Sequence, residues 1–372
     1  MEKTESRNKY LKDVKRVVVK VGTSTITDSS GALDEARITC LARDIMDCRK
    51  FVKEIIIVTS GAITAGKRLL KSTGKFKTIP ERQAAASAGQ VELMNVYSRI
   101  FRKHGAEVGQ ILLTQEDLRD RKRYLNARNT IMKLFEYSAI PVINENDTVA
   151  VNEIKFGDND TLSAHITNLA AADLLIILTD TEGFKDDSGR VMGTVPKITE
   201  KIFKYAGGTS SSCGTGGMVT KLISARMLTR SGVPVVIAAG YKDGIIKDVL
   251  SGEETGSIFL PLTEKLDGKK RWIAFNAPVR GSLVVDGGAQ EALTERGKSL
   301  LPKGIISLSG RFPEGAIVSI KGEDKKEFAR GLTNYSSEDI EKIMGKKTSE
   351  IAPLFGQKFY DEVVHRDNLV II

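Results

Sequence analysis

The feature that most constrains the fold is a regular alternation of short apolar runs with longer helical stretches over the first two thirds of the chain. Several runs are uninterrupted Val, Ile and Leu, which is typical of strands buried on both faces of a sheet. This alternation predicts a mostly parallel sheet between two helical layers, a three-layer αβα sandwich. We predict strands at 16–21, 55–59, 108–113, 140–143, 174–179, 233–238 and 257–260, and helices at 34–50, 80–104, 125–137 and 161–172. In the last helix Leu162, Ile166, Leu169 and Ala170 share one face.

The composition is that of an ordinary soluble globular protein, with 41% hydrophobic and 28% charged residues. No apolar run reaches the ~18 residues of a membrane span, and the polar N-terminus has no apolar signal-like segment. Three cysteines, Cys40, Cys48 and Cys213, are too few for a disulfide framework and include no C-x-x-C pair for zinc. These features predict a cytoplasmic protein with no membrane partner.

The composition changes near residues 263–270, a short polar stretch that reads TEKLDGKK. Short strand-like runs and frequent glycines follow it, as in a small β-barrel or half-barrel. We therefore predict a large domain at 1–262, a linker at 263–276 and a small β-rich domain at 277–372.

The net charge of +9 is carried by the larger N-terminal part. Residues 271–372 hold 15 Lys and Arg against 14 Asp and Glu, so residues 1–270 carry a net charge of +8. An anionic small molecule or a nucleotide would benefit from this excess, although solubility alone explains it equally well. Asp120 interrupts the basic run at 119–123, which favours a solvated helix face or a subunit contact over a nucleic-acid surface.

Polar residues and glycines follow the predicted strands at their carboxyl ends, where open parallel sheets bind ligands. Lys20, Ser60, the segment 144–147 and the pair Thr179-Asp180 fall at these ends, which predicts an active-site rim. Lys20 closes an apolar run, so we expect its stem to be buried and its ammonium to need an anion. A structural ion pair with an internal carboxylate is the alternative.

Two further segments carry groups suited to phosphate chemistry. Residues 214–221, GTGGMVTK, place glycines before a helix whose N-terminus and Lys221 can hold a polyphosphate. A flexible loop with a solvated lysine explains the same residues. Residues 157–161, GDNDT, precede another helix, and Asn159 or Asp160 is a candidate N-cap. Alternatively, these polar groups orient the two lysines, bind a substrate amine together with Asp147, or hold magnesium through water.

Histidine is scarce, and His104, His165 and His365 fall in helical or C-terminal stretches outside these loops. A reaction without a histidine base suits a nucleophile that is already ionised at neutral pH, such as a carboxylate with a pKa of about 4.3. Phosphoryl transfer to such a group depends on placement and charge neutralisation more than on proton removal.

Six segments follow one another along the chain: VVVKVGTSTIT at 17–27, IVTSGAITAG at 57–66, PVINENDTV at 141–149, FGDNDTLSA at 156–164, LTDTEGF at 178–184 and GTGGMVTK at 214–221. Together they resemble the amino acid kinase family and, within it, the glutamate 5-kinases. The tail from about 277, with GSLVVDGGAQEAL and GRFPEGAIVSI, resembles a PUA domain. The resemblance implies the amino acid kinase fold and an ATP-dependent phosphorylation of the γ-carboxylate of L-glutamate, the first step of proline synthesis.

The resemblance also implies roles for single residues. Lys20 and Lys221 would flank the transferring phosphoryl group and neutralise its charge, and Asp160 would orient both lysines. Glutamate would be bound by Ser60, Asp147 and Asn159, with Gly61, Asn144 and Asp158 close by. The nucleotide would be held by Lys20, Thr179, Asp180, Thr215, Gly216, Gly217, Met218, Val219, Thr220 and Lys221. Magnesium would bridge the phosphates mainly through water, without a dedicated set of protein ligands.

Regulation and assembly also follow from the resemblance. Proline would be a feedback inhibitor, the enzyme would be a homo-oligomer (dimer or tetramer), and its product would pass to glutamyl phosphate reductase. We expect a structural or regulatory role for the PUA-like domain. Its low net charge, and Ala316 where such domains often carry aspartate, argue against RNA binding.

Overall fold

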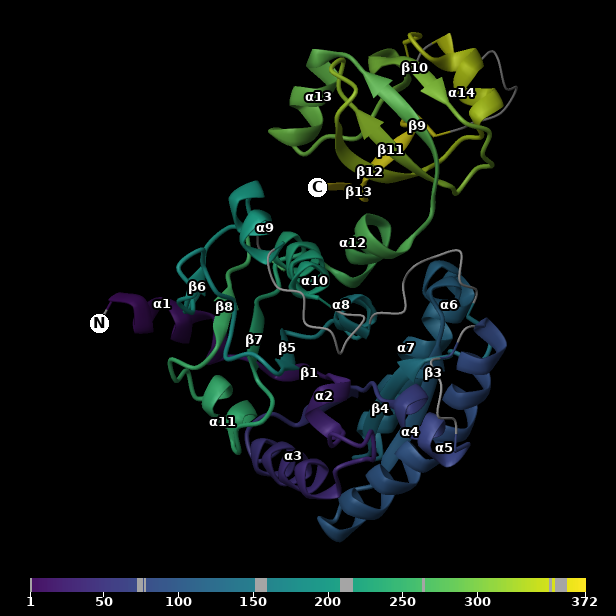
Figure 1. Cartoon of the computed structure of the whole chain (residues 1–372). Coiled ribbons are helices and arrows are strands. Elements are labelled where there is room, and N and C mark those ends of the chain that lie inside the picture. Colours follow the sequence, from purple (N-terminus) through teal and green to yellow (C-terminus); the bar gives the residue numbers. More distant parts are fainter. Residues whose placement is uncertain are drawn as a thin grey trace. The chain divides into compact units, whose positions relative to one another are not determined.

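The computed structural model describes residues 2–71, 76, 78–150, 159–207, 217–262, 265–347, 350–351 and 360–372. The chain divides into two compact units, Met1–Lys265 and Leu266–Ile372 (Figure 1). Most of the stretch that we predicted as a linker, 263–276, therefore groups with the second unit. It contains the short helix α12 (Gly268–Arg271) and a π-helix (Trp272–Asn276).

The larger unit is built on an eight-stranded sheet with the strand order β3-β4-β2-β1-β5-β7-β8-β6. The first six strands in this order are parallel, and β8 pairs antiparallel with β7 and parallel with β6. The prediction of a mostly parallel sheet is confirmed, and all seven predicted strands are present, whereas the short β6 was not predicted. The strands are β1 (Arg16–Val21), β2 (Glu54–Val58), β3 (Val108–Leu113), β4 (Ile140–Glu145), β5 (Leu174–Thr179), β6 (Thr194–Val195), β7 (Val235–Ala239) and β8 (Ser257–Phe259).

Helices cover both faces of this sheet, as the uninterrupted apolar runs require. Val17 and Val19 of β1 pack in the core that α3 and α5 share, while Val18, also fully buried, faces the opposite side. That opposite side is covered by α7, α8 and α10, which contact β4, β5 and β7 (Figure 1). The helices of this unit are α1 (Glu2–Leu11), α2 (Thr23–Ile26), α3 (Glu35–Cys48), α4 (Ala62–Leu69), α5 (Ile79–Lys103), α6 (Gln115–Arg119), α7 (Arg121–Glu136), α8 (Asn159–Leu169), α9 (Glu200–Ala206), α10 (Met218–Arg230) and α11 (Ile245–Leu250).

The strand order contains a topological switch point between β1 and β5. After β1 the chain forms β2, β3 and β4 on one side of that strand. It then crosses over and forms β5, β6, β7 and β8 on the other side. Ligands of open parallel sheets bind in the crevice that forms at such a point, beyond the carboxyl ends of the strands. The topology therefore directs attention to the ends of β1 and β5 and to the helices that begin above them.

Helix α8 departs from the prediction in two ways. It begins at Asn159, so neither Asn159 nor Asp160 is its N-cap, and that prediction is wrong. All residues from Asp160 to Leu169 are buried, so burial extends beyond the face that Leu162, Ile166 and Leu169 share. Because α8 lies between the sheet and α10, its polar residues are enclosed as fully as its apolar ones.

The smaller unit contains a five-stranded sheet in the order β10-β9-β11-β12-β13. Its apolar core is separate from that of the larger unit, which supports the prediction of a second, β-rich domain. The π-helix packs on this sheet, where Arg330 Nη1 donates to the carbonyl oxygen of Ala274 over 2.7 Å. The remaining elements are β9 (Val279–Val285), α13 (Gly287–Thr294), a 3-10 helix (Pro302–Gly304), β10 (Ile305–Ser309), β11 (Ile317–Lys321), β12 (Glu327–Thr333), α14 (Ser337–Ile343) and β13 (Val364–Ile371). In the described part of the chain, no helix is long and apolar enough to cross a membrane.

Candidate active site

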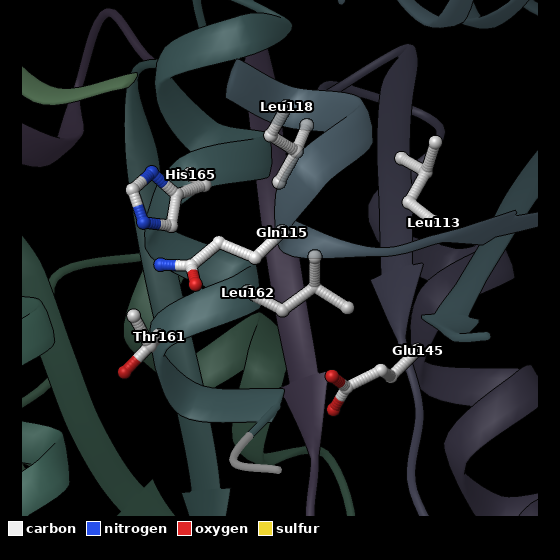
Figure 2. A pocket seen from close by; sticks show the side chains of 7 residues that line it. All are labelled: Leu113, Gln115, Leu118, Glu145, Thr161, Leu162 and His165. Atoms are coloured by element: carbon white, nitrogen blue, oxygen red, sulfur yellow. The ribbon is translucent and has the colours of Figure 1, made fainter. Parts of the chain in front are cut away.

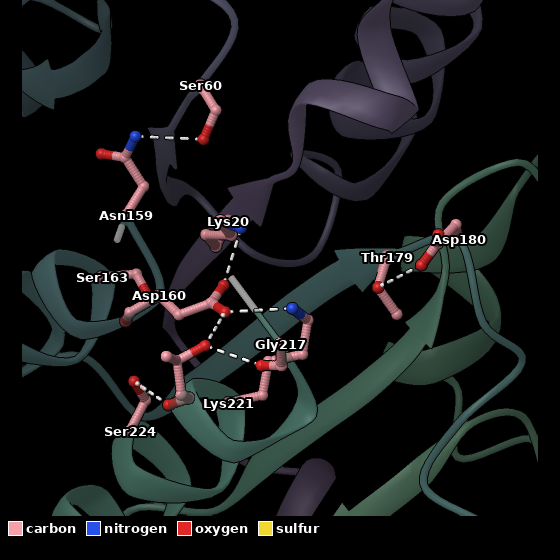
Figure 3. Close-up of polar contacts among 11 residues, drawn as sticks. Lys20, Ser60, Asn159, Asp160, Ser163, Thr179, Asp180, Gly217, Lys221 and Ser224 are labelled. Carbon is pink, nitrogen blue, oxygen red and sulfur yellow. Dashed lines mark hydrogen bonds and ion pairs between the residues drawn. The ribbon is translucent and has the colours of Figure 1, made fainter. Parts of the chain in front are cut away.

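Two lysines from distant parts of the chain meet on one buried carboxylate at the switch point. Asp160 Oδ1 lies 2.7 Å from Lys20 Nζ, and Asp160 Oδ2 lies 3.0 Å from Lys221 Nζ (Figure 3). The side chain of Asp160 is fully buried, and each lysine side chain is only 7% exposed. The structure therefore brings together the three residues for which the resemblance implied a catalytic role.

Local structure explains why these side chains meet. Lys20 is the fifth residue of β1, Asp160 the second of α8 and Lys221 the fourth of α10. Helices α8 and α10 pack against each other and both begin at the carboxyl edge of the sheet. Thr220 joins the cluster, because its Oγ1 donates to Asp160 Oδ2 over 3.1 Å and lies 2.7 Å from the carbonyl oxygen of Gly217.

Taken alone, the three charged groups of the cluster carry a net charge of +1. Burial alone would raise the pKa of Asp160, but the charges of Lys20 and Lys221 and their hydrogen bonds outweigh it and hold the pKa below its usual value. The carboxylate is therefore ionised at neutral pH, and two ammoniums share it. The N-termini of α8 and α10 add partial positive charge at the same place. This arrangement attracts an anion, and a phosphoryl group is the anion that helix N-termini and lysines commonly hold.

The alternative that we left open for Lys20, an ion pair with an internal carboxylate, is what the structure contains. The ion pair does not remove the need for an anion, because Asp160 neutralises only one of the two lysines that it contacts. Both interpretations of Lys20 therefore hold at once.

The ends of β2 and α8 contact each other beside this cluster. Asn159 Nδ2 donates to Ser60 Oγ over 3.0 Å, across 99 residues of sequence (Figure 3). Among the described residues, Asn159 Oδ1 is buried without a hydrogen-bond partner. Gly61 follows Ser60 as the N-cap of α4 with a φ of +97°, a conformation that other residues rarely adopt. Buried polar atoms are normally hydrogen-bonded, so the vacant acceptor at this edge is suited to a ligand that donates.

The next strand, β4, contributes Asn144 and, just beyond its end, Asp147. Asn144 is 2% exposed, and its Nδ2 donates to Gln90 Oε1 over 2.8 Å. Burial raises the pKa of Asp147 to about 6. No cation forms an ion pair with Asp147 in the described part of the chain. A partly desolvated carboxylate without a counter-ion is suited to binding an ammonium group.

The other side of the cluster, at the end of β5, holds the residues expected near the nucleotide. Thr179 Oγ1 donates to Asp180 Oδ1 over 3.0 Å, and the carbonyl oxygen of Thr179 accepts from the backbone N–H of Gly240 over 2.7 Å. Gly217 caps α10, whose first residues are Met218, Val219 and Thr220. Asp158, Thr215 and Gly216, also predicted as site residues, lie outside the described residues.

The chain is similar to known proteins over nearly its whole length. The model of the Amino acid kinase family matches residues 15–239, and that of the PUA domain matches residues 281–354. The chain belongs to the amino acid kinase family. Three similar relatives are glutamate 5-kinases, so the resemblance stated from the motifs is confirmed. They come from Pelobacter propionicus (46% identity over 98% of this chain and 100% of the relative), Trichlorobacter lovleyi (48%, 98% and 99%) and Moorella thermoacetica (47%, 97% and 97%).

Two solved structures align with 67% of this member of the amino acid kinase family. A UMP kinase from Bacillus anthracis aligns over 97% of its own length with a TM-score of 0.46 and 12% identity. A carbamate kinase from Giardia lamblia bound to AMP-PNP aligns over 99% of its length with a TM-score of 0.49 and 15% identity. The assignment to the amino acid kinase family rests on the family model and the sequence relatives, and not on these two structures.

The kinase unit also contains a small pocket on the α6 side of α8, next to but separate from the lysine cluster. It is lined by Leu113, Gln115, Leu118, Glu145, Thr161, Leu162 and His165 (Figure 2). His165 lies five residues after Asp160 in α8 and lines this pocket.

Sequence reasoning missed Gln90, the partner of Asn144. Gln90 lies in the middle of α5, a helix that we predicted from its period alone. The available signal was a polar residue between buried Ala86 and Leu93, on the stripe of α5 that faces the sheet. Within the described residues, Gln90 Nε2 is buried without a hydrogen-bond partner.

Proposed function

We propose that this chain transfers the γ-phosphoryl group of ATP to the γ-carboxylate of L-glutamate and forms γ-glutamyl phosphate, the first step of proline biosynthesis. The observation that carries the proposal is the buried Lys20–Asp160–Lys221 cluster beside the desolvated carboxylate of Asp147. The lysine cluster is suited to a phosphoryl group, and the carboxylate of Asp147 is suited to an amino-acid ammonium. A glutamate 5-kinase has both among its substrates.

The reaction needs little from the protein in proton transfer. An oxygen of the ionised γ-carboxylate attacks the γ-phosphorus, the bond from that phosphorus to the β-γ bridging oxygen breaks, and ADP leaves with the bonding electrons. Lys20 and Lys221 neutralise the charge on the phosphoryl oxygens during the transfer. Asp160 is a positioning residue, because it fixes both ammoniums relative to each other and does not itself react.

On the glutamate side, Asp147 would bind the α-ammonium. Ser60, Gly61, Asn144 and Asn159 would surround the rest of the molecule, with Asp158 beside them. On the nucleotide side, the residues are Lys20, Thr179, Asp180, Thr215, Gly216, Gly217, Met218, Val219, Thr220 and Lys221. The described residues contain no cluster of three or more His, Cys, Asp or Glu that could hold a metal. Magnesium would be held mainly by ATP and water, where it would offset phosphate charge.

Regulation and assembly are further parts of this proposal. Proline shares the α-ammonium and α-carboxylate pattern of glutamate, so we expect it to inhibit the enzyme. We also expect a homo-oligomer (dimer or tetramer) in the cytoplasm that delivers its product to glutamyl phosphate reductase. The PUA domain would have a structural or regulatory role rather than bind RNA.

The decisive experiment is a hydroxylamine trap of the acyl phosphate, with ATP and glutamate, acetylglutamate or aspartate offered separately. We expect hydroxamate to form at least 100-fold faster from glutamate than from the other two. A preference for acetylglutamate or aspartate would assign the chain to another branch of the family. Absence of hydroxamate with all three, together with retardation of RNA at physiological salt by the full chain, would favour a binding function led by the PUA domain.

A further inference from the structure

We propose that Gln90 is a substrate-binding residue that fixes Asn144 through Oε1 and donates from Nε2 to the α-carboxylate of the amino-acid substrate. The proposal rests on the proposed function and names a further residue for the same site. It starts from one contact: Asn144 Nδ2 donates to Gln90 Oε1 over 2.8 Å, and the two residues are 54 positions apart in sequence.

The contact fixes the orientation of both amides. Asn144 Oδ1 accepts from the backbone N–H of Glu145 over 2.9 Å, so its Nδ2 must face Gln90. That bond uses Oε1 of Gln90 as the acceptor and leaves Nε2, which carries two N–H donors, to face away from Asn144. Nε2 of Gln90 is buried and has no hydrogen-bond partner within the part of the chain that the structure describes. A buried donor of this kind loses its hydration without compensation unless a ligand supplies an acceptor.

The strand register places this donor at the substrate end of the site. Lys20 lies beside Val58 of β2, and Val58 lies beside Ile143 of β4. Asn144 is therefore one residue beyond the row that contains Lys20, and two strand spacings away from it, about 10 Å. A dicarboxylic amino acid whose γ-carboxylate reaches the lysine cluster would point its α-end toward β4. That end carries an ammonium, for which Asp147 is available, and a carboxylate, for which a donor is required.

Helix α5 holds Gln90 rigidly. Its neighbour Gly89 lies at a crossing with α4, where an added Cβ would come within 1.8 Å of the carbonyl oxygen of Ala62. The reverse contact at Gly66 is equally close, 1.7 Å from the carbonyl oxygen of Ala85. The backbones of α4 and α5 thus touch directly, and α4 begins immediately after Ser60 and Gly61. Gln90 is consequently held rigidly relative to Ser60 and Gly61, which are predicted to bind the substrate. A hydrogen-bond donor that determines specificity needs such rigid support.

Two substitutions distinguish the contact of Gln90 with Asn144 from its proposed contact with the substrate. Gln90→Leu removes both the acceptor and the donor. Gln90→Glu keeps an oxygen for Asn144 but places an oxygen where Nε2 was, opposite the substrate carboxylate. We expect Gln90→Leu to raise the KM for glutamate about 10- to 100-fold, the loss of one hydrogen bond to a charged group. We expect Gln90→Glu to raise it further, while the KM for ATP changes less than threefold in both variants.

Asn95→Leu is the matched control, because it removes an exposed amide from the same helix. Steady-state kinetics of all variants with the hydroxylamine trap, and their thermal unfolding, provide the readout. A KM for glutamate close to that of the unmodified protein in Gln90→Glu would overturn the substrate contact, because pure positioning of Asn144 survives that change. If Gln90→Leu does not fold, Gln90→Glu still decides. Failure of the proposed function is distinguishable, since the unmodified protein would then form no hydroxamate from glutamate.

Discussion

Replacing Asp160 with asparagine tests whether one carboxylate organises two like charges for catalysis. The substitution keeps the shape of the side chain and one oxygen for one lysine, but it removes the negative charge. Lys20 and Lys221 then share a buried site with a net charge of +2 instead of +1. We expect the substitution to lower the stability of the protein and to strengthen its binding of ATP.

The magnitude follows from the burial of the three groups. Removing one partner of a buried ion pair costs about 3–5 kcal/mol, because the remaining charge stays desolvated. The side chain of Asp160 is fully buried and serves two lysines that are 7% exposed, so we expect the upper part of this range. For a domain of this size, that corresponds to a fall of the unfolding midpoint by about 10 °C. The polyphosphate of ATP supplies the missing negative charge, so ATP should bind at least about tenfold more tightly and restore about 1.4 kcal/mol.

Differential scanning fluorimetry with an ATP titration measures both effects, and the hydroxylamine trap measures turnover. We expect a lower midpoint without ATP, a larger ATP-induced rise than in the unmodified protein, and turnover reduced at least about 100-fold through misplaced lysines. Asp47→Asn is the control, because it removes a carboxylate from an exposed pair with Lys50 and should change little. A folded Asp160→Asn protein that binds ATP more weakly than the unmodified chain would refute the reasoning.

Replacing Lys20 or Lys221 with alanine should lower turnover about 100-fold while the carboxylate between them keeps one partner and the fold survives; near-normal ADP release in a coupled assay would contradict this. Because the pKa of Asp147 is raised to about 6, kcat/KM for glutamate should fall as the pH drops below 6. The Asp147→Asn variant should lose this fall in kcat/KM at low pH, and its KM for glutamate should rise more than its KM for ATP. The raised pKa of Asp147 disfavours folding above pH 6, so urea titrations at pH 8 should find Asp147→Asn about 2 kcal/mol more stable to unfolding than the unmodified protein. An unchanged free energy of unfolding would argue against desolvation of the Asp147 carboxylate. Gly89→Ala should cost about 3 kcal/mol by driving a Cβ into the backbone of α4, whereas Gly287→Ala, with nothing within 4 Å, should be neutral in the same titration.

The sheet could be predicted because its strands are buried on both faces. Runs such as 16–21 and 174–179 contain little but Val, Ile and Leu, and the structure reproduces both sets of bounds. The two-residue β6 could not be found, since pairing with β8 rather than its own sequence makes it a strand. The apolar face predicted for 161–172 did not indicate that the polar residues of α8 are buried as well, because only tertiary packing decides that.

The location of the site could be predicted from local patterns, whereas the pairing of its charged groups was implied only by the family resemblance. Polar residues after apolar runs indicate the carboxyl edge of a parallel sheet wherever the strands lie in order. Which carboxylate meets which lysine depends on how α8 and α10 pack, and the local pattern alone left Asp160 as either a helix cap or a group that orients the two lysines. Gln90 was missed for a related reason, since a helical period identifies a face and says nothing of the side chain across from it.

The lysine cluster and Asp147 are better explained by ligand binding than by stability. A buried ion pair contributes little net stability, and apolar residues of similar volume are often neutral or better in its place. The desolvated carboxylate of Asp147 disfavours folding at neutral pH outright. Both features lie at the carboxyl edge of the sheet, where the topology opens a crevice. Two buried polar atoms that have no hydrogen-bond partner within the described residues, on Gln90 and Asn159, lie at the same edge. An amino acid bearing an ammonium and two carboxylates, together with a polyphosphate, satisfies all of these groups at once, whereas either molecule alone leaves part of the site uncompensated.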